Sequence, residues 1–497
     1  MFVLLLLFPV FFICSCSSDR TGIWDEYEIS ATNERSYIDN FRDVDFTAKF
    51  TRPDGSSFVK AGFFAGDNVW KVRVMPDLKG TWEYEAAFSD GSGQRKSGRF
   101  ECEASDVPGL ISSDQKNPAW FGFKGGKHIL IRSFHCGDRF FAANWSDSAR
   151  TAFLDWLAEN KYNTISVASH YLNRNSESRG RGWETPGLWD EENSCPDPAG
   201  YDRMEKILDD LAQRKIIVFP FAGFFGQSAA WPKDSLDQLL YINYTLSRLD
   251  SYWNVLYNVA GPEPLYVKLF SKDKLESLGK LISAADNNQH LLTVHNQKSK
   301  NPFRESPWAS FQCLQGPTTT NTDTLYNGLL RGRNPNQPLY AQEVLWYGNI
   351  YQQNYSDEQL RKNAFTIMMS AGALNFGDNA GTSSTGFTGT LNLNDRHQDK
   401  HEIIKRVWDF FESIPWYLMS PSPERTDNAY CLNHGDSLYL YYSPEGKAFR
   451  FNPGGKSYEG EWIKGSDPAV RMPVGNLKDS ILKPPTSEDW LIYLKQQ

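Results

Sequence analysis

The sequence lacks the features that mark nucleic-acid-binding and nucleotide-binding proteins. Its 497 residues contain no long run of lysine or arginine, and the formal net charge is −8. Because phosphate binding needs a concentrated basic patch, we expect no nucleic acid partner. No G-x-G-x-x-G follows a predicted strand, and no G-x-x-x-x-G-K-[ST] loop occurs. We therefore expect no redox or nucleotide cofactor.

Cysteine is scarce and scattered. The chain has seven cysteines, with no C-x-x-C pair and no cysteine–histidine spacing typical of a zinc site. Five of them, an odd number, lie beyond residue 16. A disulfide framework is therefore not expected, and most of these cysteines are predicted to be small buried hydrophobic residues.

Long apolar runs are absent except at the N-terminus. Residues 2–13 are rich in Leu, Phe, Val and Ile, which is short of the ~20 residues of a membrane-spanning helix but fits a signal peptide. The following Cys14-Ser15-Cys16-Ser17-Ser18 resembles a bacterial lipoprotein box. That resemblance implies that residues 1–16 are the signal peptide and that Cys16 is lipidated. It also implies a cell-envelope location, in the outer membrane or periplasm, through the lipid anchor only. A plain secretory signal remains the alternative.

Aromatic residues are abundant, with 16 Trp, 23 Tyr and 32 Phe. Their flat faces suit sugar rings, but they also fill ordinary cores, so composition does not decide between the two.

The hydrophobic pattern divides the chain into three regions. Residues 22–105 and 419–497 contain short alternating strands separated by Gly and Pro turns, which predicts an antiparallel β-sandwich in each. In residues 106–418, strand-length apolar runs alternate with amphipathic stretches. The predicted strands are 129–134, 164–169, 216–221, 255–260, 291–294, 309–314, 339–342 and 373–376, and the predicted helices are 147–160, 201–214, 235–249, 272–285, 356–370 and 401–414. This order predicts a parallel (β/α)8 TIM barrel, with an open doubly wound sheet as the alternative.

Two carboxylates stand out at the strand ends where such barrels place their active sites. Glu263 and Glu343 directly follow the fourth and seventh apolar runs. These strands lie across the barrel from each other, so both side chains can converge over its mouth. Cleavage of a glycosidic bond needs such a pair, one as a general acid and one as a nucleophile or general base. A structural ion pair with Arg or Lys is the alternative for each glutamate.

The segments around both glutamates resemble clan A glycoside hydrolases. Asn258-Val259-Ala260-Gly261-Pro262-Glu263 is similar to the acid/base segment of that clan, and Pro338-Leu339-Tyr340-Ala341-Gln342-Glu343 is similar to its nucleophile segment. The resemblance implies that Glu263 is the acid/base, that Glu343 is the nucleophile and that anomeric configuration is retained. The clan usually has Asn directly before the acid/base, where this chain has Pro262, and Asn258 is a candidate substitute.

The regions outside the barrel narrow the resemblance. The segments Gly62-Phe63-Phe64-Ala65-Gly66-Asp67 and Trp70-Lys71-Val72-Arg73-Val74-Met75-Pro76 are similar to an uncharacterised N-terminal sandwich that often precedes apiosidase-like barrels in polysaccharide-degrading bacteria. The C-terminal region resembles the collagen-binding-type β-sandwich of the same proteins.

Further polar and aromatic residues at the strand ends are candidate substrate contacts. They are His135, His170, Asn258, His295, Asn296, Gln315, Trp346 and Asp378. Arg174, Arg179 and Arg181, after strand two, are candidates for binding a uronate or sulfate group, or belong to a solvated loop. Three strand-end histidines are enough for a metal site, but the glutamate pair already accounts for a site, so we expect no metal.

The sequence therefore predicts a retaining glycoside hydrolase that acts on a plant or algal polysaccharide or oligosaccharide. Two alternatives remain. One is a non-catalytic carbohydrate-binding surface lipoprotein, and the other is an adhesin that binds matrix through its C-terminal sandwich.

Overall fold

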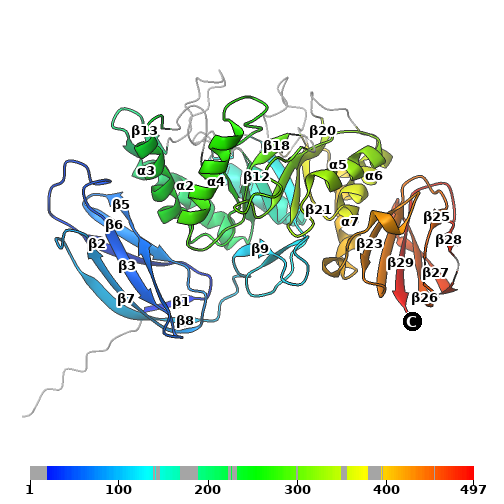
Figure 1. Ribbon diagram of the computed structural model, residues 1–497, viewed down its shortest axis with the longest axis horizontal. Helices are drawn as coiled ribbons and strands as arrows, with labels where there is room; N and C mark the ends of the chain where they lie inside the picture. The colour runs from blue at the N-terminus through cyan, green and yellow to red at the C-terminus, as the bar shows by residue number, and fades with distance from the viewer. Residues whose placement is uncertain are drawn as a thin grey trace, which may run out of the picture.

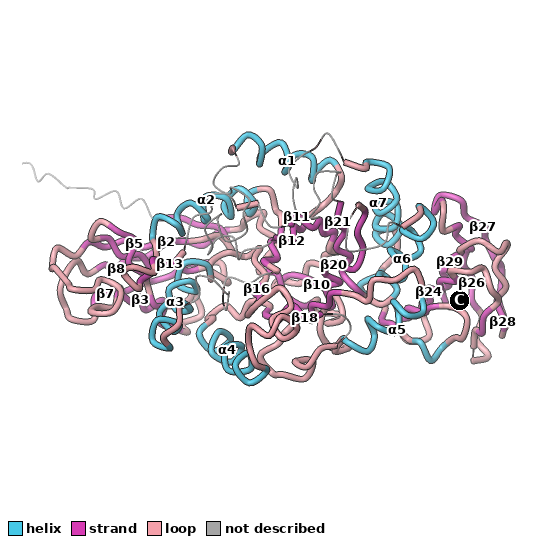
Figure 2. Tube along the Cα trace, turned by 90° about the horizontal axis from the view of Figure 1, so that it is seen from above, coloured by secondary structure: helices cyan, strands magenta, loops and turns pink. Residues whose placement is uncertain are grey.

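The computed structural model of the protein has three parts along the chain, a β-sandwich, a parallel barrel with outer helices and a second β-sandwich (Figure 1). It describes residues 19–137, 140–141, 146–167, 188–221, 225, 232–297, 300–348, 355–378, 393, 396–452, 454–478 and 480–497. The two sandwiches lie at opposite ends of the long axis, with the barrel between them (Figure 2). No helix in the described ranges is long and apolar enough to cross a membrane.

The N-terminal sandwich consists of two sheets that enclose an apolar core. Its strands are β1 (Asp19–Gly22), β2 (Tyr27–Thr32), β3 (Phe46–Thr51), β4 (Ser57–Ala61), β5 (Phe63–Gly66), β6 (Val69–Val74), β7 (Gly80–Phe88) and β8 (Lys96–Glu103). They pair in the orders β1-β8-β7-β3-β4 and β2-β6-β5. Alternate residues of β3, Phe46, Ala48 and Phe50, are buried in this core, as expected for strands with one solvated face.

Eight parallel strand positions form the barrel. They are β11 (Arg132–Gly137), β12 (Thr164–Val167), β15 (Ile217–Pro220), β16 (Tyr257–Asn258), β17 (Leu292–Thr293) with β18 (His295–Gln297), β19 (Gln312–Gln315), β20 (Leu339–Tyr347) and β21 (Gly372–Asp378). Parallel pairing runs through β15-β12-β11-β21-β20-β19-β18 and through β16-β17. A parallel bridge between Val218 and Val255 joins β15 to the start of the fourth position and closes the ring.

Helices surround the barrel strands (Figure 2). They are α1 (Asp147–Glu159), α2 (Pro198–Gln213), α3 (Ser235–Leu249), α4 (Lys272–Ala285), α5 (Thr322–Gly332), α6 (Asp357–Met369) and α7 (Gln398–Glu412). The residue before each of the first six is Ser, Asp or Asn, and its side chain accepts a hydrogen bond from the first helical turn. Such a cap satisfies backbone N–H groups that have no partner within the helix.

Two smaller hairpins accompany the barrel. β9 (Ile111–Ser113) pairs with β10 (Phe121–Phe123), and β13 (Trp189–Asp190) pairs with β14 (Cys195–Pro196). Ile111 and Phe121 share an apolar cluster with the barrel residues Phe219 and Tyr340. The β9-β10 hairpin thereby closes the barrel at the end opposite the carboxyl ends of the strands (Figure 1).

The C-terminal sandwich follows the short 3-10 helix η3 (Trp416–Leu418). Its elements are β22 (Ser420–Pro421), η4 (Pro423–Arg425), β23 (Tyr430–His434), β24 (Leu438–Ser443), β25 (Phe449–Arg450), β26 (Tyr458–Lys464), β27 (Asp467–Leu477), β28 (Ile481–Leu482) and β29 (Trp490–Gln496). They form a sheet in the order β22-β23-β24-β29-β26-β27 and the pair β25-β28. The predicted TIM barrel between two β-sandwiches is therefore confirmed.

Candidate active site

Glu263 and Glu343 both occupy unusual backbone at the carboxyl end of the barrel. Glu263 follows β16, and Glu343 lies in β20 where the register with β21 shifts between Ala341 and Leu345. Their φ angles are 45° and 52°, in the left-handed region that residues other than glycine rarely adopt. Such strain is retained where the surrounding structure imposes it, and it concentrates at functional sites.

Gln315, at the end of β19, links the two carboxylates. Its amide Nε2 donates to Glu343 Oε2 at 3.1 Å, and a side-chain hydrogen bond from the same residue acts on Glu263. The other oxygen of Glu343, Oε1, accepts from Gln342 Nε2 at 3.3 Å. The backbone N–H of Glu343 donates to Asn375 Oδ1 on β21 at 3.3 Å. Strands four, six, seven and eight thus meet around one pair of acids.

Burial makes both acids hold their protons more tightly than usual. Burial, and secondarily the charge of Glu263, raises the pKa of Glu343 from 4.5 to about 8, against the effect of the two amide donors. Burial also raises the pKa of Glu263, while the hydrogen bond from Gln315 lowers it. Because each charge disfavours the other, the pair retains one proton over a wider pH range than two separate carboxyls would.

Gly261 allows the chain to reach Glu263 from β16. A Cβ atom at this position would lie 2.1 Å from the Phe221 carbonyl oxygen, so only glycine fits. Asn258 Nδ2 donates to that same carbonyl, and Asn258 Oδ1 accepts from the His295 N–H at 3.1 Å. Both ends of the buried Asn258 amide are therefore engaged by neighbouring strand ends, which it positions.

His295 and His135 are buried neutral imidazoles beside Glu343. Burial lowers the pKa of each to about 3. The Phe221 carbonyl accepts from His295 Nδ1 at 3.2 Å, which leaves His295 Nε2 as an acceptor, 4.0 Å from Glu343 Oε1. His135 Nδ1 instead accepts from Gln342 Nε2 at 3.0 Å, so His135 Nε2 carries the proton. Neither Nε2 has a hydrogen-bond partner within the described part of the chain.

Trp346 packs inside the mouth of the barrel. Its exposed fraction is 2%, and its ring lies 4.4 Å from the ring of His135. Gly377 on β21 makes room for it, since an added Cβ would lie 2.3 Å from the indole. The indole therefore holds His135 in place from the side of β21.

Two other predicted contacts are engaged within the protein. Asp378 at the end of β21 accepts from His397 Nδ1 at 2.7 Å and from His401 Nε2 at 2.9 Å. Asn296 Nδ2 donates to the Val294 carbonyl at 2.8 Å and to Asn301 Oδ1 at 3.3 Å. These bonds fix the loops behind the site.

The remaining predicted residues lie outside the described ranges. They are His170, Arg174, Arg179, Arg181 and Cys16. No group of three or more His, Cys, Asp or Glu that could hold a metal occurs among the residues that the structure does describe.

Sequence reasoning missed the residues that support the pair. Gln342 connects Glu343 to His135 and also accepts from Ser166 Oγ at 2.7 Å. Asn375 binds the backbone of Glu343 and donates to Ser133 Oγ at 2.9 Å. All four lie on barrel strands, within the apolar runs or at their ends, so a polar residue inside an otherwise apolar strand was the available signal.

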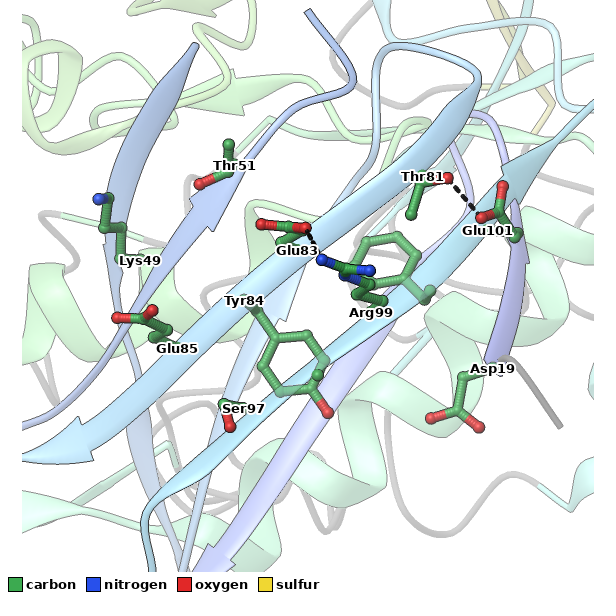
Figure 3. A pocket seen from close by; sticks show the side chains of 12 residues that line it. Asp19, Lys49, Thr51, Thr81, Glu83, Tyr84, Glu85, Ser97, Arg99 and Glu101 are labelled. Atoms are coloured by element: carbon green, nitrogen blue, oxygen red, sulfur yellow. Dashed lines mark hydrogen bonds and ion pairs between the residues drawn. The ribbon is translucent and has the colours of Figure 1, made fainter. Parts of the chain in front are cut away.

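A hollow of about 870 Å³ lies elsewhere, on the outer face of the N-terminal sandwich (Figure 3). Its side chains come from β1, β3, β7 and β8, and several pair with each other across strands. Arg99 contacts Glu83 at 2.7 Å, and Thr81 donates to Glu101 at 2.6 Å. These pairs are typical of a solvated sheet face, and we assign no chemistry to this hollow.

Comparisons with known proteins agree with the three-part arrangement. Residues 138–384 match the family model described as apiosidase-like, catalytic domain, and residues 20–89 match DUF5060, a domain of unknown function. No curated protein matches the chain.

Solved structures of similar fold span most of the chain. A candidate glycoside hydrolase from Bacteroides vulgatus ATCC 8482 is 16% identical with a TM-score of 0.75, and the match covers 97% of this chain and 100% of that one. A glycoside hydrolase family 5 protein from the same organism is 13% identical with a TM-score of 0.59, and covers 78% of this chain and 94% of that one. At these identities the likeness shows a shared fold.

Proposed function

We propose that this chain, a glycoside hydrolase whose residues 138–384 match the apiosidase-like catalytic domain, is a retaining enzyme with Glu263 as acid/base and Glu343 as nucleophile. The proposed substrate is a plant or algal polysaccharide or an oligosaccharide derived from one. The observation that carries the assignment is the meeting of two strained carboxylates at Gln315, the buried Glu343 and the partly buried Glu263, with the charge of Glu263 acting on Glu343.

A two-step displacement needs one proton on Glu263 and a negative charge on Glu343, and in a coupled pair the single retained proton belongs to both carboxyls and not to one of them. In the first step the carboxyl of Glu263 gives its proton to the glycosidic oxygen, while a carboxylate oxygen of Glu343 bonds to the anomeric carbon and the leaving group departs. In the second step Glu263 takes a proton from water, whose oxygen displaces Glu343 from the anomeric carbon. Hydrogen bonds from Gln315 and Gln342 hold the two oxygens of Glu343 for attack.

The two histidines offer complementary contacts to the sugar. We assign His135 Nε2–H as a donor and His295 Nε2 as an acceptor for hydroxyl groups beside the reacting carbon, because both atoms are buried and lack partners among the described residues. Gln315 Oε1 is a further buried acceptor without such a partner. Trp346 acts through His135, and His170 stays a predicted contact.

Substitution with chemical rescue tests the two roles. We expect Glu263→Ala and Glu343→Gly to lose turnover on plant polysaccharides and aryl glycosides by about a thousandfold. Azide should restore Glu263→Ala and give a glycosyl azide of retained configuration, because it attacks the covalent intermediate. With Glu343→Gly, azide takes the place of the missing carboxylate, displaces the aryl group of a glycoside of natural configuration in one step and should give a glycosyl azide of inverted configuration.

The matched control is Glu305→Gln, whose side chain is 74% exposed and contacts only Arg304 among the ion pairs described. It should leave turnover unchanged. Unchanged turnover in Glu263→Ala or Glu343→Gly would refute the assignment and favour a non-catalytic carbohydrate-binding protein.

We also propose that the protein is a lipoprotein of the cell envelope, modified at Cys16. The apolar run before Cys16 and the small residues around it support this proposal. Metabolic labelling with a radioactive fatty acid should label the wild-type protein and not Cys16→Ala. Equal labelling, or none in either protein, would contradict it.

A further inference from the structure

The loop that follows Glu263 is held rigidly by its own backbone. The Glu263 carbonyl accepts hydrogen bonds from the Tyr266 N–H at 2.9 Å and from the Val267 N–H at 3.1 Å, and the Pro264 carbonyl accepts from the Leu269 N–H at 2.9 Å. Leu265 and Phe270 pack against the main apolar core of the barrel. The position of Tyr266 is therefore fixed relative to Glu263 by one tight turn.

Tyr266 and Val267 point away from that core. They are 65% and 56% exposed, although both are large apolar residues. Within the described residues, the ring of Tyr266 contacts no other ring and its hydroxyl has no hydrogen-bond partner. Single exposed apolar side chains are ordinary on protein surfaces. This pair differs because its backbone N–H groups both bind the carbonyl of a strained, partly buried acid in the same tight turn.

We propose that Tyr266, flanked by Val267, is the platform on which the sugar of the leaving group stacks. The inference rests on the proposed function, because an acid/base lies on the side of the glycosidic bond from which the leaving group departs. A residue one turn beyond Glu263 is then close to that side. A tyrosine ring offers a flat apolar face at a low cost in conformational entropy, and its hydroxyl can bind sugar hydroxyls or water at the rim.

Binding without catalysis provides the first test. The probe is native electrophoresis of the full-length Glu343→Gln protein in gels that contain pectin, arabinoxylan or xyloglucan. We expect Tyr266→Ala in this background to weaken retention in the retarding gel by about tenfold, and Tyr266→Phe to stay within about twofold because the ring face remains. Leu236→Ala, which removes a side chain of 73% exposure on α3, is the control and should have no effect. The proposal would be overturned if the Tyr266→Ala protein and its Glu343→Gln parent were retained equally, or if none of the gels retained the parent protein.

Kinetics with the intact catalytic pair locate the platform. Tyr266→Ala should raise KM about tenfold for an oligosaccharide that the enzyme cleaves, and leave kcat/KM unchanged for the glycosyl fluoride of the same glycone, because fluoride has no ring to stack. Equal losses on both substrates would place Tyr266 elsewhere and refute it as a leaving-group platform. If Glu263→Ala retains turnover while Tyr266→Ala still weakens retention, the proposed function fails and a sugar platform at Tyr266 remains.

Discussion

Two glutamates of this protein are almost equally buried, and their surroundings differ. Glu205 on α2 is 6% exposed and Glu343 on β20 is 5% exposed. Glu205 forms ion pairs with Arg248 Nε at 2.5 Å and with Arg73 Nη2 at 3.1 Å. It thereby joins the N-terminal sandwich to the barrel. Glu343 accepts hydrogen bonds from the side-chain amides of Gln342 and Gln315, and the charge of Glu263 contributes to its raised pKa.

The comparison separates a structural charge from a reactive one. Two guanidinium groups compensate the charge of Glu205, so its contribution is to hold two domains together. Amide donors orient Glu343 but do not cancel its charge, and burial raises its pKa to about 8. A group that can gain or lose a proton near neutral pH is suited to chemistry, whereas a permanently paired one is not.

The largest expected contrast comes from the same substitution at both sites. Glu343→Gln should lower kcat at least about a thousandfold while the protein stays folded. Glu205→Gln should cost about 3–5 kcal/mol of unfolding free energy, because it weakens compensation of two buried arginines, and leave kcat per folded molecule unchanged. Urea unfolding and active-site titration measure both quantities. A large loss of kcat in folded Glu205→Gln would contradict the assignment of Glu205 as structural and Glu343 as reactive.

The pH dependence of stability gives a second contrast. The raised pKa of Glu343 means that the folded state binds its proton more tightly than the unfolded state. That stabilising contribution is fully present below about pH 4.5 and is lost as pH rises through about 8. Relative to Glu343→Gln, the wild-type free energy of unfolding should fall by up to about 4 kcal/mol between these limits. A constant difference between the two proteins from pH 4.5 to pH 9 would contradict this prediction.

A change in the packing around Trp346 should lower stability and activity by less than the substitutions above, but it should lower both. Gly377→Ala places a Cβ against the indole and should cost about 1–3 kcal/mol of stability. Because the indole supports His135, we also expect kcat/KM to fall about tenfold. Gly475→Ala on β27, where an added Cβ meets nothing within 4 Å, is the control. Equal effects of the two substitutions would argue against a specific role for Trp346.

The smallest expected effect concerns Gln315. Gln315→Leu removes hydrogen bonds that lower the pKa of both glutamates. Both limbs of the pH profile of kcat/KM should therefore move to higher pH, by about one unit or less. A profile that narrows or moves to lower pH would show that Gln315 does not serve both acids.

The sequence predicted the barrel, but its polar strand ends obscured where strands stop. Residues 339–342 were predicted for the seventh strand, whereas β20 runs over Leu339–Tyr347, and 129–134 were predicted for the first, whereas β11 is Arg132–Gly137. In β20 the apolar pattern resumes after Gln342 and Glu343, and pairing with β21 resumes at Leu345 beyond the register shift, so the polar pair interrupts the strand without ending it. In β11 pairing continues through His135 to Gly137 after the apolar run has stopped. Helix predictions at 235–249 and 272–285 coincide with α3 and α4.

Other features had weak or no sequence signals. Helix α5 (Thr322–Gly332) was not predicted, because Thr322, Gly328 and Gly332 weaken the apolar character of its buried face, although its cap residue Asn321 was a usable signal. The positions of both glutamates were predictable from strand ends. Their positive φ angles, the bridging role of Gln315 and the opposite protonation of His135 and His295 depend on contacts between distant strands and could not be predicted from one sequence.

The most direct test of the central claim is the pKa of Glu343 measured by carbon NMR of its labelled carboxyl, in the wild type and in Glu263→Gln. If the two acids share one site, the value should lie near 8 in the wild type and fall clearly when Glu263 loses its charge. A value near 4.5 in the wild type, or the same value in both proteins, would contradict the account.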